Sequence, residues 1–259
     1  MNIIRWLIVS FSLYSRIPMP KIIWKDEDMA HSLLFFPLVG VAIGAIEYVV
    51  YTVGMRLALP EICVMLLVGA IPLIVTGGFH VDGYMDVTDA LSSYQTMDKK
   101  LEILKDPHIG AFAVTGLIKY LLIYGAGLAV VIDRGGKNAV CMLTVICILS
   151  RVLSGISSLK LKKARKSGML VNETSNSGKI VITALTIWGI VSIVFGCFIN
   201  PLQITFILIA LMGSFLYYKN RMYKEFGGVT GDTAGYLVCI SECMMMVALA
   251  VSVYLGNVF

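Results

Sequence analysis

The chain of 259 residues is too hydrophobic for a water-soluble protein, because 58% of its residues are hydrophobic and only 14% are charged. Soluble domains carry about 25% charged residues, so the composition excludes an ordinary soluble domain and predicts an integral membrane protein. The formal net charge of +5 does not indicate a nucleic-acid partner, and none is expected.

The first apolar segment runs from Ile3 to Tyr14 and includes Arg5. It is shorter than the roughly 20 residues that a membrane span needs. We therefore expect a short helix that lies at the membrane interface or re-enters the membrane. A signal peptide would be followed by a small-residue cleavage site, which is absent here, so we expect the segment to be retained.

Seven further apolar segments are long enough to span a bilayer. They lack the period-two alternation of a membrane barrel. Since backbone polar groups must be satisfied internally in lipid, helices remain. The sequence thus predicts an all-α, polytopic membrane protein, one domain over residues 1–259, with seven transmembrane helices at about 33–59, 61–79, 109–132, 138–158, 179–198, 201–218 and 234–256.

Cysteines and two ionisable residues lie inside these predicted spans. The cysteines contain no CxxC pair and are interpreted as small hydrophobic residues. Glu47 and Lys119, deep in the first and third spans, are expected to neutralise each other. The six cysteines are Cys63, Cys141, Cys147, Cys197, Cys239 and Cys243.

Lysines and arginines are distributed unevenly between the two sets of connections. Residues 16–32, 80–108, 159–178 and 219–233 hold fourteen of them, whereas the opposite connections hold only Arg134 and Lys137. Because cations are retained on the cytoplasmic side, we expect the N-terminus and any active site to face the cytoplasm from the inner membrane. The basic run from Lys160 to Lys166 is expected to lie against anionic headgroups.

The most informative stretch is residues 77–89, GGFHVDGYMDVTD, at the end of the second span. Asp82, Asp86 and Asp89 are spaced i, i+4 and i+7, which places three carboxylates along one face of a helix. Such a set suits Mg²⁺ held jointly with the phosphates of a substrate. The alternative is a solvated acidic face.

Two other stretches are candidates for binding phosphate. Lys105 and His108 precede the third span, where they could meet an anion or simply form a turn with a snorkelling lysine. Before the last span, GGVTGD at 227–232 combines a glycine-rich anion cradle with the carboxylate of Asp232. The alternative is a flexible turn in which Asp232 caps the helix. The proposed cradle consists of Gly227, Gly228, Thr230 and Gly231.

Two ionisable residues near the cytoplasmic ends of spans complete the candidate site. The guanidinium of Arg151 could clamp a diphosphate, or it could snorkel to the interface. Glu242, ten residues after Asp232, could supply a further carboxylate to the same metal.

From end to end, the sequence resembles the adenosylcobinamide-GDP ribazoletransferase family, also called cobalamin 5′-phosphate synthase. Arg151 belongs to the resemblance, and Ala90 and Pro107-His108 depart from the commoner residues of the family. The other matching stretches are FSLYSRIPMP at 11–20, FPLVG at 36–40, GGFHVDGYMDVTDA at 77–90, LEILKDPHIG at 101–110 and GGVTGDTAGYLVCISE at 227–242.

The resemblance implies a late step of adenosylcobalamin synthesis, in which α-ribazole or its 5′-phosphate is joined to adenosylcobinamide-GDP with release of GMP. Mg²⁺ would be bound by Asp82, Asp86, Asp89, Asp232 and Glu242, with Arg151 and Lys105 nearby. Which carboxylate accepts the proton of the ribazole hydroxyl stays open. So does the choice between a single chain, a homo-oligomer and a complex with other cobalamin-synthesis enzymes.

Two other functions compete with this one. CDP-alcohol phosphotransferases also carry aspartate-rich Mg²⁺ motifs on membrane helices, but their pattern has Ala-Arg where this chain has Met85-Asp86. An ion-coupled transporter would place its acidic groups near the membrane midplane between internal repeats, and no repeat is visible here.

Overall fold

The computed structural model describes residues 3–175 and 178–258, which form twelve α-helices and one short 3₁₀ helix. The described residues contain no strand. An isolated parallel bridge joins Lys163 to Val229. The predicted all-α fold is confirmed.

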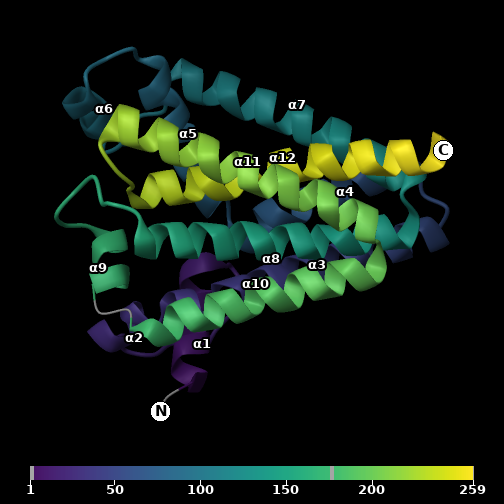
Figure 1. Cartoon of the computed structure of the whole chain (residues 1–259), viewed down its shortest axis with the longest axis horizontal. Coiled ribbons are helices and arrows are strands. Elements are labelled where there is room, and N and C mark those ends of the chain that lie inside the picture. Colours follow the sequence, from purple (N-terminus) through teal and green to yellow (C-terminus); the bar gives the residue numbers. More distant parts are fainter. Residues whose placement is uncertain (1–2, 176–177, 259) are drawn as a thin grey trace.

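Six described helices are long and apolar enough to cross a membrane, and each overlaps a predicted span. They run side by side along the longest axis of the molecule (Figure 1). The prediction of a multi-pass membrane protein is confirmed. These helices are α3 (Phe36–Arg56), α7 (Ala111–Arg134), α8 (Gly136–Lys160), α10 (Lys179–Ile199), α11 (Pro201–Phe226) and α12 (Gly231–Val258).

The second predicted span, residues 61–79, differs from the prediction. Helix α4 (Glu61–Thr76) ends before two glycines, and α5 (Phe79–Ser92) then leaves at 91°. Only if this bent pair counts as one span are there seven. Gly77 and Gly78 both adopt the left-handed conformation, with φ of 64° and 80°, which interrupts the helix at a position that hydropathy alone does not reveal.

Helices α8 and α12 form the centre of the bundle. In their most apolar stretches 78% and 67% of the residues are buried, against 28% for both α10 and α11. Glycines of α3 bring that helix very close to α8. A Cβ atom added at Gly40 would lie 2.6 Å from the carbonyl oxygen of Cys147, and one at Gly44 would overlap Thr144. Close approach of this kind is how small residues drive helix packing in membranes.

The N-terminal segment forms helix α1 (Ile3–Tyr14), as predicted, and it stands across the long helices in Figure 1. The short helix α2 (Asp26–Ala30) and the 3₁₀ helix η1 (Ser32–Phe35) hold it in place. The Arg5 guanidinium donates to the Asp28 carboxylate at 2.6 Å and lowers the pKa of that group. The indole of Trp6 stacks on the His31 ring at 4.0 Å.

The expected pairing of Glu47 with Lys119 is wrong. Glu47 is fully buried on the α3 face that meets the core, whereas Lys119 lies on the exposed face of α7. Neither Glu47 oxygen has a hydrogen-bond partner among the described residues. Membership of a predicted span does not tell which face of the helix a residue occupies, and here the two faces point apart.

The remaining short helices, α6 (Met97–Ile103) and α9 (Met169–Ser175), lie at the end of the bundle opposite the C-terminus (Figure 1). An ion pair between Lys100 and Glu225 fastens α6 to the last turns of α11. The kink between α4 and α5 and the start of α12 are at this end too. The segments singled out in the sequence therefore converge on one end of the molecule.

Candidate active site

Helix α5 carries the three aspartates on one face, as their spacing predicts. The glycine kink directs this helix away from α4. A Cβ atom at Gly77 would lie 2.4 Å from the Arg16 side chain, and the φ of 64° at this position also favours glycine. Asp82 is exposed, while Asp86 and Asp89 are half-buried.

The first turn of α12 packs directly against α5. A Cβ atom at Gly83 would lie 2.6 Å from the backbone oxygen of Asp232, which shows how closely the two backbones approach. Asp86 lies within electrostatic range of Asp82, Asp89 and Asp232. The structure thus brings the two acidic segments together, although most of the chain separates them in sequence.

The GGVTGD segment is ordered by the protein rather than left open as a cradle. The Val229 amide donates to Lys162 at 2.9 Å, and the Ala164 amide donates to Val229 at 3.0 Å. A Cβ atom at Gly228 would lie 2.5 Å from the Lys162 oxygen. Gly228 therefore lets this segment pack closely against the backbone of residues 162–164.

Thr230, rather than Asp232, caps helix α12. The Thr233 amide donates to the Thr230 hydroxyl at 3.2 Å, and the Thr230 amide donates to the Thr233 hydroxyl at 2.8 Å. The Thr230 hydroxyl also donates to the Asp232 carboxylate at 3.3 Å. The reciprocal threonine cap leaves the Asp232 carboxylate turned toward the pocket described next.

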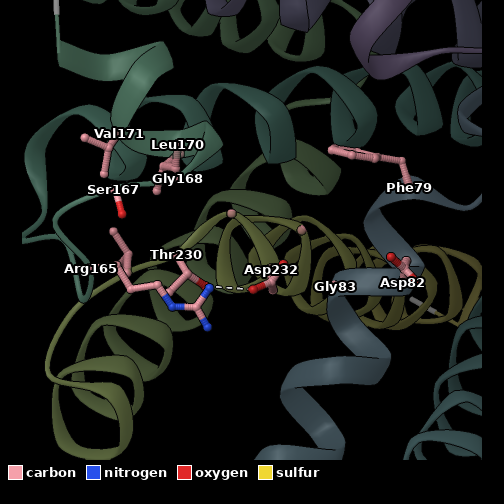
Figure 2. Close-up of a pocket in the computed structure, with 13 residues that line it drawn as sticks. Phe79, Asp82, Gly83, Arg165, Ser167, Gly168, Leu170, Val171, Thr230 and Asp232 are labelled. Atoms are coloured by element: carbon pink, nitrogen blue, oxygen red, sulfur yellow. Dashed lines mark hydrogen bonds between the residues drawn. The ribbon is translucent and has the colours of Figure 1, made fainter. Parts of the chain in front are cut away.

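A pocket of about 180 Å³, here called the outer pocket, opens between α5, α9 and the start of α12. Figure 2 shows Asp232 between Arg165 and Asp82. Arg165 and Asp82 both act electrostatically on Asp232. The residues around the pocket include Phe79, Asp82, Gly83, Arg165, Ser167, Leu170, Thr230, Gly231, Asp232 and Gly235.

Arg165 is the cation that lines the outer pocket. The sequence motifs did not single it out as a site residue. It lies in the basic run 160–166, which was assigned to lipid headgroups. One Nη of Arg165 donates to the Leu101 carbonyl at 2.7 Å, and Nε has no partner among the described residues. The available signal was the basic run itself, but nothing in it distinguishes Arg165 from its neighbours.

Arg151 and Glu242 lie in the core, where they line a smaller cavity that shares no residue with the outer pocket. Arg151 is only 1% exposed and donates to Glu242 at 2.8 Å and to the Cys147 carbonyl at 2.7 Å. The Ser150 hydroxyl donates to the same Glu242 oxygen at 2.9 Å. Neither charged residue lines the outer pocket. A buried guanidinium needs a charged partner, and Glu242 provides it across the α8–α12 contact.

Lys105 and His108 lie beside the site rather than in it. Both are exposed and neither lines the outer pocket. His108 pairs with Asp106, with 2.6 Å between Nδ1 and Oδ1. The end of their turn does reach the acidic face, since a Cβ atom at Gly110 would overlap the Asp89 carboxylate. The turn that carries the two predicted phosphate ligands therefore ends beside the third aspartate.

The donor atoms of the site fit a magnesium ion only if a substrate shares it. Among the residues that the structure describes, no three His, Cys, Asp or Glu side chains are close enough to hold a metal by themselves. Mg²⁺ is usually held by one or two carboxylates together with waters and substrate phosphates. Asp82 and Asp232, which share the outer pocket, provide that number.

Comparisons with known proteins agree with the resemblance drawn from the motifs. The family described as cobalamin-5-phosphate synthase matches residues 6–250. An adenosylcobinamide-GDP ribazoletransferase of Lachnoclostridium phytofermentans is 33% identical over 96% of this chain and 94% of its own length. The enzyme of that name from Clostridium perfringens is 33% identical over 90% and 92%, respectively. No solved structure matches. With nearly all of its length covered, the chain belongs to the cobalamin-5-phosphate synthase family.

Proposed function

We propose that this membrane protein joins adenosylcobinamide-GDP to α-ribazole, or to its 5′-phosphate, and releases GMP. Family membership and the names of the relatives support this activity. The structural observation that carries it is the outer pocket, where Asp82, Asp232 and Arg165 come together from three separate segments. Two carboxylates for a metal and one guanidinium for phosphate are the groups that phosphoryl transfer requires.

The metal in this proposal is Mg²⁺, held by Asp82 and Asp232 and assisted by Asp86, which lies within their electrostatic range. When bound, it would neutralise the charge of the diphosphate. Asp89 lies farther along α5, beside Gly110. Its carboxylate adds to the negative charge that attracts the metal. Glu242 is left out of the ligand set because its Oε1 accepts from Arg151 and Ser150 in the core and the residue does not line the outer pocket.

The transfer itself exchanges one phosphorus–oxygen bond for another. A hydroxyl oxygen of the ribazole ribose bonds to the phosphorus that is attached to cobinamide. The bond from that phosphorus to the bridging oxygen breaks, and GMP leaves with the oxygen. Arg165 binds the leaving phosphate, since a guanidinium pairs well with its oxygens. A carboxylate of the site that is not bound to metal accepts the hydroxyl proton.

The outer pocket faces the cytoplasm in this proposal, from the inner membrane of the cell. It lies at the end of the bundle that contains α6 and α9, where the cation-rich connections gather. A reporter inserted near Lys163 should be cytoplasmic, and one fused after Phe259 external. The reverse result would place the aspartates away from cytosolic nucleotides and contradict the proposal.

A CDP-alcohol phosphotransferase and an ion-coupled transporter have less support. Neither is the family that matches the chain. The aspartates lie at one end of the bundle with an arginine in the same pocket, which suits a diphosphate better than a coupling ion at the midplane.

The decisive assay uses protein purified in detergent with adenosylcobinamide-GDP, α-ribazole and Mg²⁺. We expect stoichiometric release of GMP that stops when EDTA is added and returns with excess Mg²⁺. Replacing adenosylcobinamide-GDP by CDP-diacylglycerol and a lipid alcohol is the matched control. Release of CMP in that control, without release of GMP in the main reaction, would favour the competing enzyme class.

A further inference from the structure

A groove lies at the end of the bundle opposite the outer pocket, between the first turns of α4 and the last turns of α7 and α12. The C-terminus marks this end in Figure 1. The groove, here called the distal groove, has a volume of about 430 Å³, compared with about 180 Å³ for the outer pocket. The proposed transfer reaction uses no part of it.

The distal groove is charged at one end and apolar at the other. Glu61 is the first residue of α4, and Asp133 and Arg134 are the last two residues of α7. One turn farther into the bundle, the walls are apolar and include Met65 and Ala129. Both helices belong to segments that can cross a membrane. The groove therefore runs from the membrane surface at its charged end toward the hydrocarbon at its apolar end.

The apolar wall continues from the distal groove along the outside of the bundle. Leu66 follows the groove residue Ile62 by one turn of α4 and is 61% exposed. Leu122 precedes the groove residue Ala129 by two turns of α7 and is 68% exposed. Side chains at these spacings share one face of a helix. A ligand in the groove therefore has apolar surface that leads from it toward the middle of the membrane, as an acyl chain requires.

Arg134 is the one cation among the described residues that line the distal groove. Its Nε donates to the Asp133 carboxylate at 3.2 Å, and its guanidinium carbon lies 5.5 Å from the centre of the Tyr254 ring. Asp133 and Tyr254 line the distal groove, whereas neither lines the second pocket that Arg134 borders. These contacts place the guanidinium on the side of the groove. The pair with Asp133 is half-exposed and therefore weak, so a phosphate can bind the same guanidinium.

The two carboxylates of the distal groove restrict which phosphate-bearing ligand fits. Glu61 and Asp133 supply two negative charges against the single positive charge of Arg134. A headgroup with only negative charge would be repelled by the surplus. A headgroup with a phosphate and a primary ammonium matches both signs. A quaternary ammonium has the charge but lacks the N–H donors that a carboxylate accepts.

We propose that the distal groove binds phosphatidylethanolamine from the membrane leaflet at that end of the bundle. The phosphate pairs with Arg134 and the ammonium donates to Glu61. The groove extends over roughly 8 Å of helix, which accommodates the headgroup and the first methylene groups. The remaining acyl chains lie against the exposed faces that carry Leu66 and Leu122. This inference goes beyond the proposed function and does not depend on it.

The test measures lipid binding to the full chain, purified in a mild detergent and stripped of lipid. Phosphatidylethanolamine, phosphatidylcholine and phosphatidylglycerol with identical acyl chains are added in turn. Phosphatidylethanolamine should bind about tenfold more tightly than the other two, which is the effect of one charge-assisted hydrogen bond. It should also raise the apparent Tm in a saturable way, because it binds the folded state. Native mass spectrometry counts the bound lipid, and thermal unfolding gives the Tm.

Two pairs of variants at the charged end separate the groups of the lipid. Arg134→Gln should weaken binding of phosphatidylethanolamine by about tenfold. Lys137→Gln removes the same charge at the same end of the bundle, but Lys137 is exposed and does not line the distal groove. This matched control should stay within about twofold of the parent chain. Glu61→Gln should reduce the preference for phosphatidylethanolamine over phosphatidylcholine, since it removes the acceptor charge of the ammonium.

A third pair of variants tests the apolar part of the distal groove. Ala129→Leu fills space between α4 and α7 and should lower binding of phosphatidylethanolamine by about tenfold or more, as steric exclusion of the first methylene groups requires. Ala126→Leu adds the same side chain on the exposed face of α7, outside the groove, and is the matched control. Arg134→Gln changes only an exposed side chain, so the test stands even if Ala129→Leu folds poorly.

Each outcome decides for or against the lipid site. Selective loss of phosphatidylethanolamine in Arg134→Gln, with Lys137→Gln unchanged, would support it. Equal binding of all three lipids, with Arg134→Gln no different from Lys137→Gln, would mean that only the general lipid shell occupies the groove, and the proposal would be wrong. Tighter binding of phosphatidylglycerol would show an anion site without selection by Glu61, which also overturns it.

Discussion

An arginine meets acidic side chains at two places in this protein, and the two places differ in burial. Arg151 and Glu242 are 1% and 5% exposed, and their charges are satisfied by each other between α8 and α12. Arg165 lies with Asp82 and Asp232 around an open pocket. The same residue types therefore form a buried ion pair in one place and a site for a charged ligand in the other.

The first prediction tests the open pocket by removing one of its carboxylates. Asp82→Asn and Asp232→Asn should each lower kcat/KM by roughly 10³-fold, because each removes charge that acts on the metal and the transferred phosphate. The apparent Tm in detergent should hardly change, since neither side chain forms an ion pair among the residues that the structure describes. GMP release and thermal unfolding measured on the same preparations check both parts.

The double variant Asp86→Asn with Asp232→Ala tests whether these groups act on one centre. Groups that hold one metal give strongly non-additive losses. Fully additive losses in transition-state free energy would mean two separate sites. That outcome would remove the basis for treating the α5 and α12 carboxylates as one site.

The second prediction concerns the buried ion pair of Arg151 and Glu242. Arg151→Leu should lower the free energy of unfolding by about 3–5 kcal/mol, because it leaves the Glu242 carboxylate in the core without its guanidinium partner. Restoring neutrality with Arg151→Leu plus Glu242→Leu should recover much of that loss. Yield of folded protein and apparent Tm in detergent are the measurements. A stable Arg151→Leu protein that folds normally but has lost GMP release would instead support the role at the diphosphate that the sequence suggested.

A third prediction uses Glu173, a second buried carboxyl, which is 4% exposed and accepts a hydrogen bond from the Tyr14 hydroxyl. The unfolded chain loses this proton near 4.5 and the folded chain near 7, so the folded state holds more protons between these values. The free energy of unfolding should therefore fall as pH rises from 4.5 to 7, by up to about 3 kcal/mol from this group. The titratable groups that act on it are Tyr14 and Lys163.

Glu173→Gln should remove this part of the pH dependence and stabilise the protein at pH 8 relative to the parent chain. Glu102→Gln is the matched control, because Glu102 is exposed and pairs only with Lys99 on the surface of α6. Apparent Tm measured at several pH values in one detergent is the readout. Identical pH profiles for the parent chain and Glu173→Gln would contradict the assignment.

Hydropathy and motif spacing predicted most of the fold and part of the site. The apolar segments mark the long helices because lipid forces their backbones to be helical. The i, i+4, i+7 spacing of Asp82, Asp86 and Asp89 places them on one face of α5, as found. Cation counts and motifs also indicated that this segment and Asp232 belong to the same end of the bundle.

What the sequence could not predict depends on which residues face each other. The pairing of Arg151 with Glu242 depends on the rotation of α8 against α12, which no spacing within either helix determines. The choice of Arg165 among the basic residues 160–166 depends on the backbone bonds that fix this segment to Val229. The turn of 91° between α4 and α5 depends on left-handed glycines that a hydropathy average ignores.

The smallest effects are expected for the cations outside the outer pocket, which are compared here with Arg165 inside it. Lys105→Ala and His108→Ala should each change kcat/KM by less than about threefold, because both side chains are exposed and neither lines the pocket. Arg165→Ala should instead raise the KM for adenosylcobinamide-GDP by about tenfold or more, and Arg165→Lys should recover only part of it, since lysine lacks the guanidinium fork. Steady-state GMP release at varied adenosylcobinamide-GDP measures all four variants. A loss at Lys105 as large as the loss at Arg165 would mean that the turn before α7 closes over the substrate, and the pocket as drawn in Figure 2 would then be only part of the phosphate site.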